Sequence, residues 1–263
     1  MSTIDATDQP VTGAARSKNP FDWLAAGWRD LTAAPSVTLA YGLLFFVTSW
    51  VIVGALFFFG AEGILFPAIA GWLLVGPILA IGLYHTAQRM AVGKKHSIAS
   101  AIHIKASSLQ QVGFAGALLM VLLLAWVRSA AILYALFFGI RGFPGIEELV
   151  NTLFLTWSGI AMVAIGTLVG GLFAALGFAI SAFSIPMLLS REIDVFTAMA
   201  RSASTVWNNF GVMILWGAII VGLAFVGIIT GFLGMIIVFP LLGYATWHAY
   251  AAFFGDDPAT TGA

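Results

Sequence analysis

GWLLVGPILAIGLYH, residues 71–85, is the stretch on which the fold prediction rests. It is an apolar run that contains a proline, Pro77, and ends eight residues later in a titratable group, His85. The same spacing joins Pro186 to Asp194 and Pro240 to His248. Three occurrences in one chain predict a repeated structural unit.

The composition around these runs is that of a membrane protein. Apolar residues make up 61% of the 263 and charged residues only 8%, and several uncharged runs approach the roughly 20 residues that a helix needs to cross a bilayer. We therefore predict an all-α, polytopic membrane protein with six transmembrane helices. The balance of 11 basic and 11 acidic residues does not indicate a nucleic-acid partner, and the lack of cysteine excludes disulfides and thiolate sites.

Each repeated unit is predicted to be an interfacial amphipathic helix followed by a transmembrane hairpin. Asn19-Pro20 is typical of a helix start, and the apolar stripes that follow the three predicted starts are Phe21, Leu24, Trp28 and Leu31; Ile98, Ala101, Ile102 and Leu109; and Phe196, Met199, Ala203 and Val206. The units span about 19–88, 94–193 and 194–254. Residues 1–18 and 255–263 are predicted to be cytoplasmic tails, the first of them disordered.

The middle unit is distinctly longer than the other two, with an insertion near 128–160. The apolar run from Val112 to Val127 would nearly cross the bilayer and leave Arg128 at the outer interface. We interpret residues 130–156, interrupted at Arg141-Gly142-Phe143-Pro144-Gly145, as a hairpin that lies on or projects from the outer surface.

The positions of the basic residues predict the orientation. All but two lie on one side of the six-span arrangement, and by the positive-inside rule that side is cytoplasmic. We therefore expect a multi-pass protein of the bacterial inner (plasma) membrane with both termini in the cytoplasm. The residues on that side are Arg16, Lys18, Arg29, Arg89, Lys94, Lys95, Lys105, Arg191 and Arg201.

His85 and His248 are the candidate cofactor ligands. Two imidazoles on repeat-related helices can hold a haem or a metal ion, but an imidazole near a helix C-terminus, next to an aromatic residue, is also typical of a helix-end anchor. Because Asp194 takes the corresponding place in the third unit, anchoring is the favoured interpretation, with no cofactor. Haem is the alternative.

The prolines and Arg128 also have two interpretations. Pro77, Pro186 and Pro240 would kink their spans and could line a transport path, or they could shape helix packing. Arg128 is either a functional charge within the bilayer or a side chain that reaches the outer interface, where it could pair with Glu62, Glu147 or Glu148. The spacings Gly166-x-x-x-Gly170 and Gly227-x-x-x-Gly231 favour close helix packing.

The segment 19–31 (NPFDWLAAGWRDL), the stretch 76–85 and the proline contexts at 184–186 and 239–240 resemble a bacterial family of predicted integral membrane proteins of unknown function. The resemblance covers nearly all of the chain after the N-terminal tail. Members are sometimes labelled as similar to cytochrome c oxidase subunit I, although four histidines are too few to ligate two haems and copper. The resemblance implies no catalytic residues.

Two functions remain from the sequence. The absence of a catalytic motif predicts that the protein is not an enzyme. We predict a non-catalytic accessory or scaffold subunit of a larger membrane complex, with partner subunits in the bilayer and a respiratory oxidase as the first candidate complex. The alternative is a small-molecule or lipid transporter with a cavity at the three proline kinks.

Overall fold

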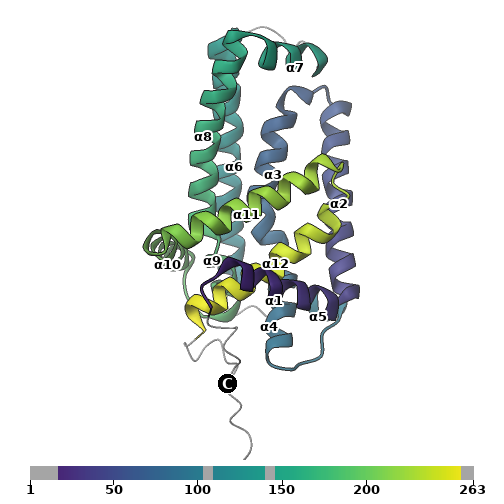
Figure 1. The fold of residues 1–263 in the computed structure, drawn as a ribbon, viewed down its shortest axis with the longest axis vertical. Coiled ribbons are helices and arrows are strands. Elements are labelled where there is room, and N and C mark those ends of the chain that lie inside the picture. The colour runs from purple at the N-terminus through teal and green to yellow at the C-terminus, as the bar shows by residue number, and fades with distance from the viewer. Residues whose placement is uncertain (1–16, 103–108, 140–145, 256–263) are drawn as a thin grey trace, which may run out of the picture.

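The computed structural model describes residues 17–102, 109–139 and 146–255, and all regular elements in these ranges are helical. Six segments are long and apolar enough to cross a membrane, which confirms the predicted fold class. The elements (Figure 1) are α1 (Pro20–Ala33), α2 (Pro35–Phe58), the 3-10 turn η2 (Glu62–Ile64), α3 (Leu65–Leu79), α4 (Ile81–Ala91), α5 (Ile98–Ile102), α6 (Leu109–Phe138), α7 (Ile146–Leu155), α8 (Trp157–Ser181), α9 (Ser184–Ser190), α10 (Val195–Asn208), α11 (Phe210–Ile229) and α12 (Met235–Phe254).

The hairpins differ in direction. In Figure 1, α2, α3, α6 and α8 run along the long axis of the molecule, whereas α11 and α12 cross them obliquely. The prolines also differ in setting: Pro77 lies in α3 shortly before the helix break at Ala80, Pro186 lies in α9 after a break at 182–183, and Pro240 lies within the continuous α12. This arrangement does not show the three-unit repeat, which stays a prediction.

The core surrounds α12. Its side chains Tyr244 and Tyr250 are fully buried, together with Trp23 of α1, Trp216 of α11 and Leu83 of α4. Glycines allow the close approach: a Cβ added to Gly27 would lie 2.8 Å from the backbone N of Ala245, and one added to Gly42 would overlap the backbone of Ile236. Helices α1 and α2 therefore pack directly against the backbone of α12.

Helix α1 is confirmed, and its predicted apolar stripe lies partly against protein and partly on the surface. The Asn19 side chain accepts a hydrogen bond from the Phe21 N–H at 3.2 Å, as expected of a helix cap. The face that packs on α12 carries Trp23 and Leu31, whereas Phe21 and Trp28 are 58% and 52% exposed. The helix has apolar residues on two faces, so periodicity alone did not distinguish the face that packs on protein from the face that is left for lipid.

The middle unit shows how residues 130–138 are connected to the span before them. Helix α6 runs without a break from Leu109 to Phe138, through Arg128, so these residues extend the same helix beyond the predicted outer interface. No glycine or proline occurs between Gly116 and Gly139 to end the helix. Residues 140–145, with Arg141, lie outside the described ranges. The chain returns through α7 and α8, and Figure 1 shows these helices and the end of α6 projecting beyond the α2–α3 turn.

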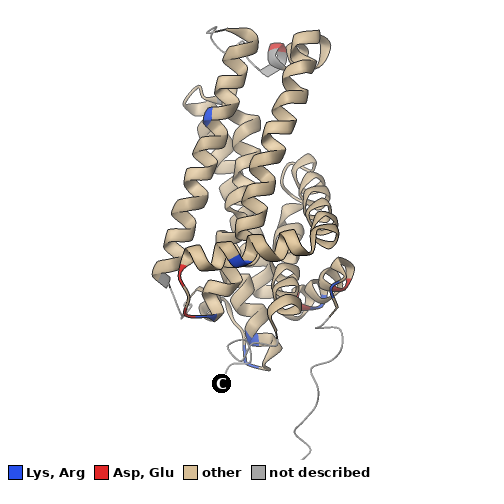
Figure 2. Ribbon diagram, turned by 90° about the vertical axis from the view of Figure 1, so that its left-hand side faces the viewer, with Lys and Arg blue, Asp and Glu red and all other residues tan. Residues whose placement is uncertain are grey.

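We call residues 129–138, α7 and residues 157–161 the outer crest. The other end of the molecule carries most of the described basic residues, as Figure 2 shows. Arg128 directly precedes the crest residues of α6. Arg16 and Lys105 lie outside the described ranges. So do the predicted tails, apart from residues 17, 18 and 255.

Candidate functional site

His85 lies in α4 and contacts the short helix α5. Its Nδ1 is 3.1 Å from the backbone oxygen of Ser100, and the ring is half-buried. The neighbouring Tyr84 is buried in the core. The side chain therefore fastens the end of the second candidate span to the polar segment that follows it.

His248 makes a comparable contact to a different helix. Its Nε2 lies 2.7 Å from the Oδ2 of Asp30, at the C-terminal end of α1, and the two side chains are only 23% and 17% exposed. The contact lies one turn from the close approach of α1 and α12 at Gly27. The histidine thus holds α1 on α12.

The two histidines therefore have separate partners, α5 and α1. This arrangement agrees with the anchoring interpretation. Among the residues that the structure describes, no group of three or more His, Cys, Asp or Glu side chains is placed to hold a metal ion. Haem ligation by His85 and His248 stays an untested alternative.

Asp194 has a role unlike that of the histidines. It is the N-cap of α10, and its Oδ1 accepts a hydrogen bond from the Thr197 N–H at 2.9 Å. Hydrogen bonds from the Thr197 hydroxyl and N–H lower the pKa of this exposed carboxyl. The residue therefore begins the next helix, whereas His85 and His248 lie within α4 and α12.

Arg128 is exposed and lies 19 residues after the start of α6, which at about 1.5 Å per residue is roughly 28 Å along the helix. That distance is close to the roughly 30 Å thickness of the apolar layer, as expected of a side chain at the outer interface. Within the described residues Arg128 makes no ion pair with Glu148, and the side chains of Glu62 and Glu147 lie outside the description.

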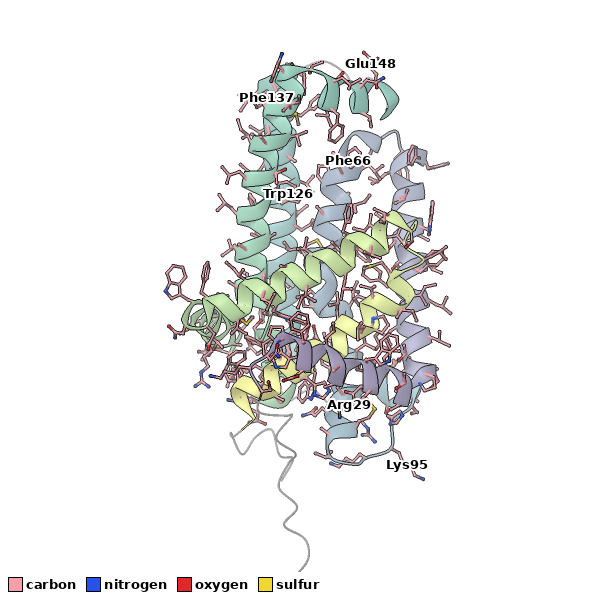
Figure 3. All side chains as sticks on the ribbon, in the orientation of Figure 1. Arg29, Phe66, Lys95, Trp126, Phe137 and Glu148 are labelled. Carbon is pink, nitrogen blue, oxygen red and sulfur yellow. The ribbon has the colours of Figure 1, made fainter. Side chains whose placement is uncertain are left out.

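A large cavity lies at the base of the outer crest, between α3, α6, α7 and α8. Its volume is about 660 Å³, within the roughly 300–1,000 Å³ of typical small-molecule sites. Figure 3 marks Phe66 on α3 and Trp126 on α6, which both line it. We call it the outer cavity; its lining residues are Gly63, Ile64, Phe66, Pro67, Ala70, Gly71, Leu74, Trp126, Ala130, Ala131, Leu133, Tyr134, Leu153, Phe154, Met162, Val163, Gly166, Thr167, Gly170, Phe173 and Ala174.

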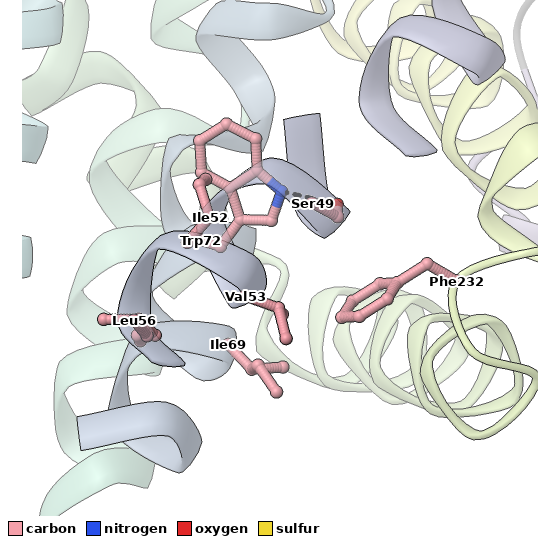
Figure 4. A pocket seen from close by; sticks show the side chains of 8 residues that line it. Ser49, Ile52, Val53, Leu56, Ile69, Trp72 and Phe232 are labelled. Carbon is pink, nitrogen blue, oxygen red and sulfur yellow. Dashed lines mark hydrogen bonds between the residues drawn. The ribbon is translucent and has the colours of Figure 1, made fainter. Parts of the chain in front are cut away.

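The outer cavity is not where the transport hypothesis places one, because none of Pro77, Pro186 and Pro240 lines it. A second pocket, between α2, α3 and the α11–α12 turn (Figure 4), has a volume of only about 10 Å³, roughly the room for one water. There the Trp72 Nε1–H donates to Ser49 Oγ at 3.0 Å. The small pocket therefore offers no ligand site.

Residues 65–190 match the model of a family described as Predicted integral membrane protein (DUF2189). The match covers just under half of the chain. It confirms the family resemblance noted from the sequence, whereas residues 19–31 and 239–240 lie outside it. No curated protein and no solved structure matches the chain.

The segment that matches the family runs from α3 to α9 and includes His85, Arg128 and Pro186, but not Asp194 or His248. It also includes every residue that lines the outer cavity except Gly63 and Ile64. Sequence reasoning missed this cavity. The one available signal was the Gly166-x-x-x-Gly170 spacing, which was interpreted as helix packing alone.

Those two glycines have different surroundings. A Cβ on Gly170 would lie 2.8 Å from the Trp126 ring, so this glycine does allow helices α6 and α8 to approach closely. Gly166 has no atom within 4 Å of that position and faces the outer cavity. In this Gly-x-x-x-Gly spacing, Gly170 therefore allows close helix packing, whereas Gly166 leaves open space in the cavity.

Proposed function

We propose that this chain is a non-catalytic accessory or scaffold subunit of a larger membrane-protein complex, and that a partner packs on the outer crest. The observation that carries the proposal is the apolar character of the crest. Helix α6 has 30 residues, about 45 Å of helix against an apolar layer of roughly 30 Å. Its last ten residues therefore exceed the reach of the bilayer.

Two observations support placing the last ten residues of α6 outside the bilayer at the crest: the polar contacts at the start of α6 and the position of Arg128. Gln111, near the start of α6, accepts a hydrogen bond from the Val195 N–H of α10 at 3.0 Å, so the helix begins among polar contacts. The crest instead exposes large apolar side chains: Leu155, at the end of α7, is 77% exposed and Trp157, at the start of α8, is 89% exposed. Exposed apolar surface outside a bilayer is typical of an interaction site. The other exposed members that do not line the outer cavity are Ile132, Leu136 and Ile160.

The proposal includes location and orientation. The basic residues at the end opposite the crest support a cytoplasmic placement of both termini in a bacterial inner membrane, with the crest on the outer side. A respiratory oxidase is the first complex to test, because of the label given to some members of the family that the chain resembles.

A crosslinking experiment tests the proposal. A photo-crosslinking amino acid at Leu155, in the crest, is compared with one at Val221, which is 66% exposed on α11. After irradiation of intact cells, we expect Leu155 to give a discrete protein adduct, identified by mass spectrometry, and Val221 to give none. Equal adducts at both positions, or none at Leu155, would contradict the proposal, and oxidase subunits in the adduct would identify the complex.

A transporter with its cavity at the three proline kinks has less support. The large cavity lies away from those prolines. The haem alternative is tested by comparing the absorbance spectra of the purified wild type and of a His85→Ala, His248→Ala double variant. Haem ligation predicts a pigment in the wild type that the double variant loses.

A further inference from the structure

We propose that the outer cavity binds one long hydrocarbon chain, supplied by a bilayer lipid or a free fatty acid. This inference goes beyond the subunit role, because it needs no protein partner. It rests on the shape, the chemistry and the open side of the cavity.

The outer cavity is elongated. Its lining on α8 runs from Met162 to Ala174, a distance of about 18 Å at 1.5 Å per residue. Leu74 closes the lower end, where its side chain packs against Gly177 of α8 so tightly that an added Cβ would lie 2.8 Å away. Leu153 and Phe154 of α7 form the upper end. A long slot of this kind suits a chain-like ligand better than a compact one.

None of the described residues that line the cavity is charged. The Trp126 indole N–H is already occupied, since it donates to the backbone oxygen of Pro67 at 3.0 Å. Tyr134 and Thr167 supply hydroxyls that make no hydrogen bond within the described part of the chain, so they are available to a hydroxyl, ester or carboxyl oxygen. The apolar walls of an unfilled cavity lack contact atoms on one side, so a hydrocarbon chain that fills it gains those contacts.

The open side of the cavity indicates the source of the chain. The Trp126–Pro67 hydrogen bond joins α6 to α3, and Gly170 packs on Trp126 to join α8 to α6. Helices α3 and α8 pack together at the floor, where Leu74 contacts Gly177, and above it the cavity lies between them. Along the upright helices, the floor lies farther from the crest than Arg128 does. Since Arg128 lies near the outer interface, the floor lies within the apolar layer. A hydrocarbon chain can therefore enter from the bilayer between α3 and α8.

Gly166 provides the test and Gly171 its control. Both glycines lie on α8 with no atom within 4 Å of an added Cβ, but only Gly166 lines the cavity. Gly166→Leu should fill the slot without disturbing the helices, while Gly171→Leu adds the same side chain elsewhere on the same helix. The full chain is reconstituted in nanodiscs with either a diazirine-bearing palmitic acid or a phosphatidylglycerol that carries the same chain, irradiated, and digested for mass spectrometry.

We expect labelling at peptides that include residues 126–134 or 162–174, competed by excess palmitic acid or unlabelled lipid. Gly166→Leu should reduce it about tenfold or more, the effect of a misplaced methylene in an apolar pocket, and Gly171→Leu should leave it unchanged. The better labelled of the two probes identifies the source. Equal labelling of the two variants, or wild-type labelling outside these peptides, would overturn the proposal. The wild-type map and competition decide the matter even if Gly166→Leu fails to fold.

Discussion

Gly42→Ala should destabilise the protein through a direct clash between α2 and α12. The new methyl would overlap the carbonyl oxygen of Ile236 and lie 2.8 and 2.9 Å from its carbonyl carbon and Cα. Carbon atoms pack at about 3.5–4.0 Å, so the two helices would have to separate by nearly 1 Å. The atoms in the way are backbone atoms, which cannot rotate aside. Overpacking of this kind costs about 1–3 kcal/mol.

Gly54→Ala, on the same helix, is the matched control. No atom lies within 4 Å of its added Cβ, so the change should bring only the helix-propensity gain of about 1 kcal/mol. The free energies of unfolding should therefore differ by about 1–3 kcal/mol, with the propensity gain common to both variants. Denaturation in one detergent, followed by tryptophan fluorescence, measures both. Equal stability of the two variants would refute the proposed α2–α12 crossing.

Three further changes test other contacts. His248→Ala should cost about 1.5–3 kcal/mol, because it leaves the largely buried carboxylate of Asp30 without its partner, and adding Asp30→Asn should cost less than the sum of the single changes in thermal unfolding. Thr230→Val removes the hydroxyl that accepts a hydrogen bond from the backbone N–H of Gly234 at 2.8 Å in the α11–α12 turn, and it should cost about 1–3 kcal/mol in the same assay. Thr246→Val is the control and should cost little, because the Thr246 hydroxyl donates only within its own helix. The capping hydrogen bonds that lower the pKa of Asp194 stabilise the fold at a pH above the ordinary carboxyl pKa of about 3.9, and that stabilisation is lost as the pH falls through the lowered pKa. The difference in stability between wild type and Asp194→Ala should therefore shrink on acidification. A difference that grows would contradict this account.

The helices themselves were largely predictable from the sequence, but their relation in space was not. Apolar run length and the Asn19-Pro20 start predicted the spans and α1, because both depend on local chemistry. The oblique course of α11 and α12 depends on where glycine allows α12 to approach its neighbours, at Gly27, Gly42 and Gly243. Those pairings join residues far apart in the sequence, so spacing along the chain contained no signal for them.

Arg128 shows that a charge indicates the depth of a span and not the end of its helix. The sequence predicted Arg128 at the outer interface because charged groups avoid the bilayer. Arginine is nonetheless a good helix former, and the exposed side chain of Arg128 lies where it can reach the outer interface. The helix continues to Gly139, which has a φ of 75°, a conformation that glycine adopts readily. The conformation of Gly139 therefore determines where α6 ends, and the charge of Arg128 determines only how deeply the helix sits in the bilayer.

The outer cavity escaped prediction for a related reason. Its lining is dispersed over residues 63–174 and consists of ordinary apolar and small side chains, so no motif marks it. A cavity arises from what neighbouring helices fail to fill, and this becomes visible only when α3, α6 and α8 are placed together. The titratable groups that the sequence did single out, His85, His248 and Asp194, instead have structural contacts.

The two proposals concern the same pair of long helices, α6 and α8, and their burial explains why. In the most apolar window of each of these spans only 6% of residues are buried inside the protein, against 61% for α12. Helix α12 is therefore held by the chain itself, whereas most of the surface of α6 and α8 must be covered by something else. Lipid can cover the part within the bilayer, and a bound chain can fill the space toward α3. The part of the crest that does not line the cavity, with Leu155 and Trp157, lies beyond the reach of both. A partner that binds there should therefore remain bound when Gly166→Leu has filled the cavity.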